Sequence, residues 1–167
     1  HHKTIDWDQV PELLNRISLN RCNTHINSVA ATKLMLMTFL RAGALTRMEW
    51  EWVGEQFFIV PGTTPGLKRR RGKSDHIPHH VPITPQINAI LEHMERLHGR
   101  WQYVFPQLRQ SRYEHLDPSA PNDFLKRIGY DGELVAHGWR SVARTYGVDI
   151  LKAREIVIQR QMGHLPT

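Results

Sequence analysis

The spacing of apolar residues predicts a chain built mainly from amphipathic helices. Near the start, Val10, Leu13, Leu14 and Ile17 recur three and four positions apart. Pro11 falls in the first turn of this segment, where a helix tolerates proline. The segment is therefore predicted to be a helix that packs one face against a core.

A second helix is predicted from Ile26 to Leu40, with Asn23 or Thr24 as its N-cap. Its last turns are apolar on every side, which is typical of a helix buried at the centre of a domain. Arg41 follows directly. An arginine in this place either complements the negative end of the helix dipole or is a functional group on a rigid support, and the helix pattern alone allows both.

The middle of the chain predicts a small antiparallel sheet. Residues 57–60 are a run of β-forming side chains, and residues 76–83 resemble an edge strand because prolines interrupt them. The most basic stretch of the chain, residues 68–75, lies between them. We expect residues 57–83 to form a hairpin with a protruding basic tip, although the tip itself can also be a flexible, solvated charge run.

Helical signals return after the hairpin. Thr84 followed by Pro85 is a strong helix start, and the apolar stripe behind it ends near Gly99. Shorter helices are predicted around residues 124–128, after His137, and around residues 156–161. The sequence therefore predicts a mainly α fold with a small antiparallel β-sheet (α+β), formed as one domain over residues 1–167.

Composition narrows the class of partner. Apolar residues make up 40% and charged residues 23% of the chain, as in folded globular proteins. The formal charge of +6 favours a polyanionic partner, but a basic surface kept for solubility also explains it. Cys22 is the only cysteine, so no internal disulfide can form, which fits a reducing cytosol. No signal peptide or apolar run of membrane-spanning length is visible, and a cytoplasmic location is predicted.

His137 and Arg140 lie three positions apart and therefore share one face of a helical turn. The planar fork of arginine can hold two oxygens of a phosphate. Histidine can hydrogen-bond the same phosphate or move a proton near neutral pH. Such a pair is common by chance, so it gains meaning only if other basic residues converge on it. Trp139, between the two, is expected to anchor the turn in the core.

A group of histidines raises the question of a metal site: His76, His79, His80 and His115. Metal ligands need convergent geometry and supporting partners, which the sequence does not indicate. We expect histidines beside a basic loop to face a polyanionic partner or solvent, and we expect no metal or cofactor.

Taken in order, these features resemble the catalytic domain of tyrosine recombinases, especially phage and genomic-island integrases. The matching segments are Arg41-Ala42-Gly43-Ala44-Leu45, Val81-Pro82-Ile83-Thr84, Tyr103-Val104-Phe105-Pro106, His137-Gly138-Trp139-Arg140 and Met162-Gly163-His164. Each segment alone is a weak signal. Their shared order and spacing over nearly the whole chain make the resemblance specific.

The resemblance implies strand cleavage by a tyrosine that attacks a DNA phosphodiester without a metal. Arg41 and Arg140 would neutralise the non-bridging oxygens, because they stay charged and can hold two oxygens at once. His137 would assist proton transfer or hold the phosphate, and His164 would donate a hydrogen bond to it. Lys68, in the basic hairpin, would protonate the leaving 5′-oxygen.

Three points of the resemblance are less regular. Lys73 is an alternative to Lys68, because the register of the hairpin is uncertain. The family usually has an acidic residue where Ala44 stands, so a support for Arg41 is missing or is supplied by Glu49. The family's tyrosine follows the histidine that His164 matches. The tyrosines of the chain all precede His164: Tyr103, Tyr113, Tyr130 and Tyr146. We expect Tyr146 to be a packing residue.

These departures leave two classes of function. The first is a site-specific recombinase that integrates or excises a mobile element, in which residues 1–167 form a catalytic domain that ends before its tyrosine and lacks the parent's N-terminal DNA-binding domains. The second is a non-catalytic, basic DNA-binding module. In both, the partner is double-stranded DNA. The resemblance implies a tetramer on DNA, with the isolated fragment monomeric. A metal-dependent nuclease is disfavoured by the lack of clustered carboxylates.

Overall fold

The computed structural model describes residues 3–67, 69 and 72–165. Its helices are α1 (Val10–Leu19), α2 (Ile26–Thr38), α3 (Ala42–Leu45), α4 (Pro85–His98), α5 (Ala120–Leu125), α6 (Ala136–Thr145) and α7 (Glu155–Gln161). Short helical turns lie at Trp7–Gln9, Trp50–Trp52, Lys126–Tyr130 and Tyr146–Ile150. Strands β1 (Phe57–Val60) and β2 (His79–Pro82) pair in an antiparallel sheet. The predicted mainly α fold with one small sheet is confirmed.

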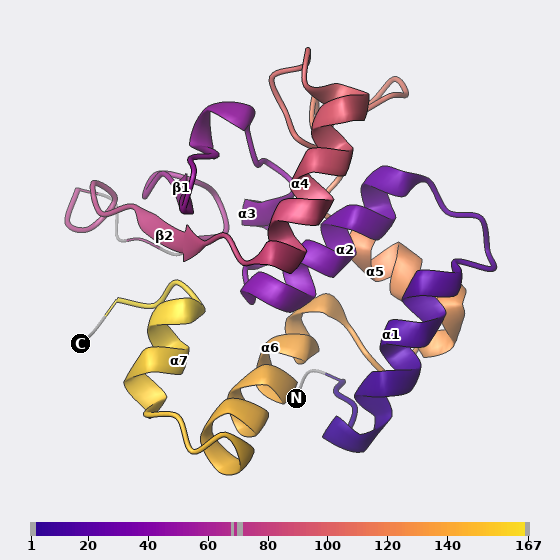
Figure 1. The fold of residues 1–167 in the computed structure, drawn as a ribbon, viewed down its shortest axis with the longest axis vertical. Helices are drawn as coiled ribbons and strands as arrows, with labels where there is room; N and C mark the ends of the chain where they lie inside the picture. The colour runs from indigo at the N-terminus through magenta and orange to yellow at the C-terminus, as the bar shows by residue number, and fades with distance from the viewer. Residues whose placement is uncertain (1–2, 68, 70–71, 166–167) are drawn as a thin grey trace.

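Helix α2 lies at the centre of the domain (Figure 1) and contacts α3, α4 and α5. Apolar residues are buried on several of its sides: Val29, Ala30, Ala31, Leu34, Met35 and Leu36. The prediction of a central buried helix is therefore confirmed.

Both ends of α2 differ from the prediction. The N-cap is His25, whose Nδ1 accepts a hydrogen bond from the Asn27 amide at 3.2 Å. Asn23 and Thr24 instead donate their amides to Asn20. The helix ends at Thr38 and not at Leu40, because Phe39 has a left-handed backbone with φ 60° and ψ 14°. Arg41 is thus separated from α2 by a sharp turn.

The sheet has one buried and one exposed face. Phe58 lies opposite Val81 and Val60 lies opposite His79, and all four are buried. Successive side chains of a strand point to opposite faces, so the neighbouring His80 is exposed. The predicted strands are confirmed, and the alternation turns His79 inward.

Helix α4 begins as the sequence predicts. The Thr84 hydroxyl accepts from the Ile87 amide at 3.3 Å, and Pro85 occupies the first turn. At the other end, the Gly99 amide donates to the Glu95 carbonyl.

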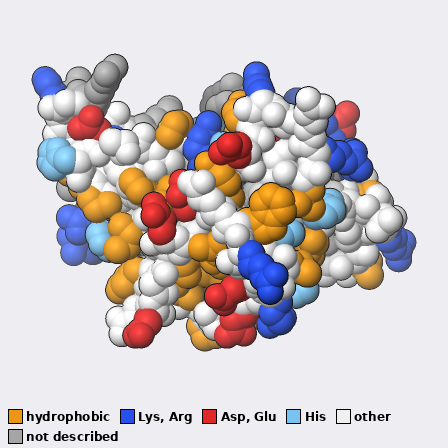
Figure 2. All heavy atoms as spheres, turned by 90° about the horizontal axis from the view of Figure 1, so that it is seen from above, with side chains coloured by type: hydrophobic (Ala, Val, Ile, Leu, Met, Phe, Trp, Pro, Cys, Tyr) orange, Lys and Arg blue, Asp and Glu red, His pale blue; other side chains and the backbone are white. Residues whose placement is uncertain are grey.

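Figure 2, which looks down on the top of Figure 1, shows acidic and basic side chains interspersed on the upper face of the molecule.

Helices α6 and α7 pack against each other, and α7 lies between α6 and the sheet (Figure 1). Trp139 anchors α6 to α2: it is 5% exposed, and its Nε1 donates to the Leu36 carbonyl at 2.9 Å. A Cβ added at Gly138 would collide with the Lys3 carbonyl, so glycine is needed where the N-terminal segment crosses α6. The anchoring role predicted for Trp139 is confirmed.

Candidate active site

Arg41 stands immediately before α3 and is half-buried. Its Nη1 donates to the Gly66 carbonyl at 3.3 Å, and its Nη2 lies 3.5 Å from Nε2 of His164. Its Nε is buried with no hydrogen-bond partner. Burial lowers the pKa of the Arg41 guanidinium, so this cation is held where water solvates it incompletely.

The backbone of Gly66 takes the place of an acidic support for Arg41. Gly66 has φ 96°, and a Cβ there would lie 2.8 Å from the Ala44 amide nitrogen. The small side chains at both positions let the Gly66 carbonyl approach the guanidinium. Glu49, the replacement considered from the sequence, instead accepts a hydrogen bond from Gln102 at 3.1 Å.

Arg140 projects from α6 and is only 5% exposed. Its Nη1 donates to the Phe39 carbonyl, and its Nη2 donates to the Met162 carbonyl at 3.1 Å. The same Nη2 lies 3.1 Å from Nε2 of His164. Burial, reinforced by the positive charge of Arg41, lowers the pKa of Arg140 to about 10.

Neither arginine has a carboxylate partner among the described residues. The ion pairs within 4.0 Å in that part of the chain are Arg16–Glu12 and Arg144–Glu155, both on the surface. A buried charge without a counter-ion costs free energy. An anion placed between Arg41 and Arg140 would remove that cost.

His164 closes the group from the end of α7. The tight turn before it requires Gly163 at φ 79°, and the His164 amide donates to the Gln159 carbonyl at 2.9 Å. Since arginine only donates hydrogen bonds, Nε2 of His164 accepts from Arg140 in this arrangement. Arg41, Arg140 and His164, predicted to line one site, are therefore brought together; we call them the clamp.

The remaining residues predicted for the site are His137, Lys68 and its alternative Lys73. His137 is exposed on α6, one turn before Arg140. Lys68 lies outside the described residues. Lys73 is exposed in the hairpin between β1 and β2, beside a turn closed by the Gly72 amide and the Asp75 carboxylate at 2.9 Å.

Two basic residues that were not predicted to belong to the active site lie beside the clamp. Arg69 donates through Nη1 to the Gly163 carbonyl and through Nε to the Ile77 carbonyl at 3.1 Å. His79 is 7% exposed and has a buried Nε2 without a partner. Strand alternation from Phe58 and Val81 could have placed His79 inward, but no local signal distinguished Arg69 within the basic run.

The tyrosines are engaged in packing. Tyr146 stacks on Trp7 with ring centroids 3.4 Å apart, and Tyr130 is 3% exposed beneath Arg16. Tyr113 stacks on His115, and Tyr103 meets the same ring edge-on. The packing role predicted for Tyr146 is confirmed.

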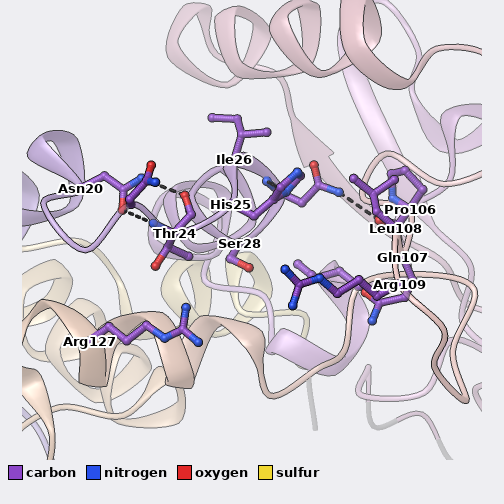
Figure 3. Close-up of a pocket in the computed structure, with 13 residues that line it drawn as sticks. Asn20, Thr24, His25, Ile26, Ser28, Pro106, Gln107, Leu108, Arg109 and Arg127 are labelled. Carbon is purple, nitrogen blue, oxygen red and sulfur yellow. Dashed lines mark hydrogen bonds between the residues drawn. The ribbon is translucent and has the colours of Figure 1, made fainter.

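A pocket at the other end of α2 does not contain the clamp. It has a volume of about 670 Å³, and Arg109 and Arg127 point into it below Ser28 (Figure 3). Asn20 beside it bonds both the amide and the carbonyl of Thr24, at 3.0 and 2.8 Å. We place the candidate active site at the clamp, because its guanidiniums are buried and the Nε of Arg41 has no hydrogen-bond partner. An anion would compensate these groups, whereas the arginines of the pocket are exposed to solvent.

The described residues contain no group of three or more His, Cys, Asp or Glu side chains arranged to hold a metal. His79 and His80 face opposite sides of β2, and His115 lies with Tyr103 and Tyr113. Within the same residues, no helix has the length and apolarity needed to cross a membrane.

The fold is that of the catalytic domain of tyrosine recombinases. The crystal structure of XerA recombinase has a TM-score of 0.69 to this chain and covers 99% of it, with 17% identity, while the chain covers 56% of that structure. The lambda integrase catalytic core has a TM-score of 0.63 at 17% identity, and the match covers 99% of this chain and 94% of that one. At these identities the likeness shows the fold alone.

The chain belongs to the phage integrase family, whose family model matches residues 3–165. It is 26% identical to prophage integrase IntZ of Escherichia coli K12, over 99% of this chain and 39% of that protein. It is 24% identical to the integrase of Enterobacteria phage P4, over 98% and 38% respectively. The chain thus spans about two-fifths of the length of these relatives.

Proposed function

We propose that the protein is the catalytic part of an integrase, a site-specific recombinase that cuts and rejoins double-stranded DNA to integrate or excise a mobile element. The observation that carries the proposal is the clamp: two partly or fully buried guanidiniums converge on one histidine, and neither has a carboxylate partner in the described part of the chain. A phosphodiester is an anion of the size and charge that this arrangement lacks.

In the proposed reaction, a tyrosine oxygen attacks the scissile phosphorus while the bond to the 5′-oxygen breaks. The products are a 3′-phosphotyrosine and a 5′-hydroxyl, and attack by a 5′-hydroxyl reverses the step. Arg41 and Arg140 stabilise the charge that develops on the non-bridging oxygens. His164, whose Nε2 accepts from Arg140 in the structure without DNA, is proposed to donate a hydrogen bond to these oxygens when the phosphate is bound. In the family that the chain resembles, the attacking tyrosine follows the histidine that His164 matches, and we propose the same order here; the four tyrosines of this chain precede His164.

The remaining roles concern proton transfer. The tyrosine loses its proton as it attacks, and the leaving 5′-oxygen gains one. His137, exposed one turn before Arg140, is proposed to accept a proton or hold the phosphate. Lys68 is proposed as the acid for the 5′-oxygen, with Lys73 as the alternative in the same hairpin.

Assembly and location are proposed from the relatives. One solved lambda integrase structure is a dimer bound to a COC′ core site, and another is a tetramer bound to a Holliday junction. We propose that the whole protein likewise acts as a tetramer on duplex DNA, while residues 1–167 alone are monomeric. The reaction would take place in the cytoplasm of a bacterial host, where the relatives' prophage DNA resides.

Covalent trapping of the whole protein on a nicked suicide substrate tests the proposal. Arg140→Ala is expected to lower trapping by about 10³-fold or more, because it removes a preorganised charge that stabilises the transition state. The matched control is Arg144→Ala, one turn further along α6, where the arginine is exposed and paired with Glu155. Undiminished trapping by Arg140→Ala, or equal loss in the control, would contradict the assignment.

The basic excess of the chain favours DNA binding as a second, non-catalytic function. Phosphate contacts release counter-ions, so affinity for duplex DNA should fall about tenfold or more between 50 and 200 mM salt. Fluorescence anisotropy at several salt concentrations measures this slope. A salt-dependent complex that never traps covalently would favour the binding module, and salt-independent binding would refute a phosphate-binding surface.

A further inference from the structure

Two arginines from other elements hold the turn that leads into His164. Arg140 of α6 donates through Nη2 to the Met162 carbonyl at 3.1 Å. Arg69, in the hairpin between β1 and β2, donates through Nη1 to the next carbonyl, that of Gly163. This carbonyl belongs to the peptide group that joins Gly163 to His164, so the bond acts directly on the backbone of His164. Arg140 is a member of the clamp, whereas Arg69 lies outside it and connects it to the hairpin.

The second hydrogen bond of Arg69 lies within the hairpin. Its Nε donates to the Ile77 carbonyl at 3.1 Å, and Ile77 lies on the return path of the hairpin, just before β2. The guanidinium is a rigid plane whose N–H groups keep fixed directions. One side chain therefore connects the outgoing part of the hairpin, its return path and the turn before His164, and it sets the spacing between them.

The environment of Arg69 distinguishes it from the exposed part of the basic run. Arg69 is half-buried, and burial lowers the pKa of its guanidinium, whereas Lys73 of the same hairpin is exposed. The turn lies against the base of the hairpin, because a Cβ added at Gly163 would be 3.0 Å from Cδ1 of the buried Leu67. Since Nε and Nη1 are both bonded to carbonyls, Arg69 has fewer N–H groups left to hold two oxygens of a phosphate.

We propose that Arg69 is a positioning residue for His164: it fastens the Gly163 turn to the hairpin and so sets how His164 faces the two arginines of the clamp. Although it belongs to the basic run of residues 68–75, Arg69 acts through the backbone at the end of α7 and not through a contact with DNA. The fastening of the turn follows from the contacts above, whereas its importance for strand cleavage rests on the proposed function.

Amide hydrogen exchange of the whole protein tests the fastening. The Gly163 amide donates to the Arg160 carbonyl and the His164 amide to the Gln159 carbonyl, both at 2.9 Å. Arg69→Met removes both donors of the side chain, and we expect exchange at these two amides to accelerate about tenfold, the effect of losing one hydrogen bond that holds the turn. Arg69→Lys keeps the charge and a donor that can reach only one carbonyl, so the acceleration should be about threefold.

The matched control is Lys73→Met, which removes the same charge from an exposed position of the same hairpin and should leave both amides unchanged. Acceleration confined to residues 161–164 supports the proposal. Unchanged exchange in folded Arg69→Met, or equal acceleration throughout α2, overturns it. If Arg69→Met does not fold, Arg69→Lys takes its place, and unchanged exchange in that variant is equally decisive.

DNA binding and trapping separate a positioning role from a phosphate contact. Loss of one phosphate contact lowers the slope of log affinity against log salt by about one. Arg69→Met should keep the slope of the wild type, while covalent trapping at saturating DNA falls about fivefold or more, because a misplaced histidine stabilises the reacting phosphate poorly. Arg96→Met, which removes a charge from the exposed side of α4, should change neither quantity.

The outcomes distinguish this inference from the proposed function. A slope that is lower by about one in Arg69→Met, or trapping that is undiminished in it, overturns the positioning role. A wild type that binds DNA but never traps covalently, with the exchange pattern as expected, refutes the proposed function and supports the fastening of the turn.

Discussion

The polar side chains at the two ends of α2 differ in how completely they are hydrogen-bonded. At the N-terminal end, Asn27 is 2% exposed, and its Nδ2 donates to the Pro106 carbonyl at 2.9 Å. Its Oδ1 lies 2.8 Å from Nε2 of His98, and its amide donates to the His25 ring. The polar groups of this network hydrogen-bond one another, which is how buried polar groups stabilise a fold.

At the C-terminal end, the polar groups are charged and incompletely paired. Arg41 and Arg140 share His164 as a partner, and Nε of Arg41 is buried without one. The same helix therefore supports two kinds of polar group. At one end a paired hydrogen-bond network contributes to stability, and at the other end incompletely paired cations can bind an anion. Substitutions at the two ends should therefore separate stability from activity.

The largest effect is expected from Arg41→Met. Trapping of the whole protein on a suicide substrate should fall by about 10²–10³-fold, because one charge on the transition state is lost. Stability in urea should change by less than about 1 kcal/mol, because the methionine stem replaces a charge that is poorly solvated. Arg96→Met, on the exposed side of α4, is the control. A large loss of stability would show that Arg41 supports the fold.

The reverse pattern is expected from Asn27→Ala. Removing this side chain leaves the Pro106 carbonyl and the His98 ring without their buried partner, at a cost of about 2–3 kcal/mol in the free energy of unfolding. Trapping by the folded protein should stay within about twofold of the wild type. Urea denaturation measures the first effect, with Asn15→Ala on the exposed side of α1 as the control. Equal stability of the two variants would show that the network contributes nothing.

A smaller effect should appear in the pH dependence of stability. Burial, followed by the positive charge of Arg69, lowers the pKa of His79 from 6.5 to about 4; His80 and Arg140 add to this. The unfolded chain takes up this proton at a higher pH, so the contribution of His79 is complete above pH 6.5 and is lost as the pH falls toward 4. Over this interval the unfolding constant should rise about tenfold per pH unit through His79 alone.

Urea denaturation at several pH values measures that slope. Because carboxylates titrate in the same range, the informative quantity is the difference between the wild type and His79→Asn, which lacks the titrating ring. The asparagine variant should show a shallower acid slope. Identical slopes would contradict a depressed pKa at His79.

Features that depend on neighbouring residues were predictable from the sequence. Thr84 and Pro85 mark the start of α4 because a cap and a first-turn proline act within one turn. The apolar run of residues 57–60 likewise defines β1. The convergence of Arg41, Arg140 and His164 was predictable because their segments resemble those of a known family. No local pattern in the sequence requires it.

Features that depend on distant contacts were not predictable. Phe39 ends α2 early because its backbone is left-handed. A bulky side chain disfavours this conformation, so the local sequence does not predict it. Arg69 acquires its role from Gly163, 94 residues further along the chain. His79 looked like one of several histidines near a basic loop until strand register turned it inward.

The left-handed turn at Phe39 also gives the clamp a counter-charge that cannot be titrated. The aligned peptides of α2 place about half a negative charge at its C-terminal end, and the turned Phe39 carbonyl offers it to Arg140. A carboxylate in that place would neutralise the cation and compete with a phosphate for it. A helix end compensates only part of the charge and keeps the remaining attraction for an incoming anion at any pH at which the fold persists.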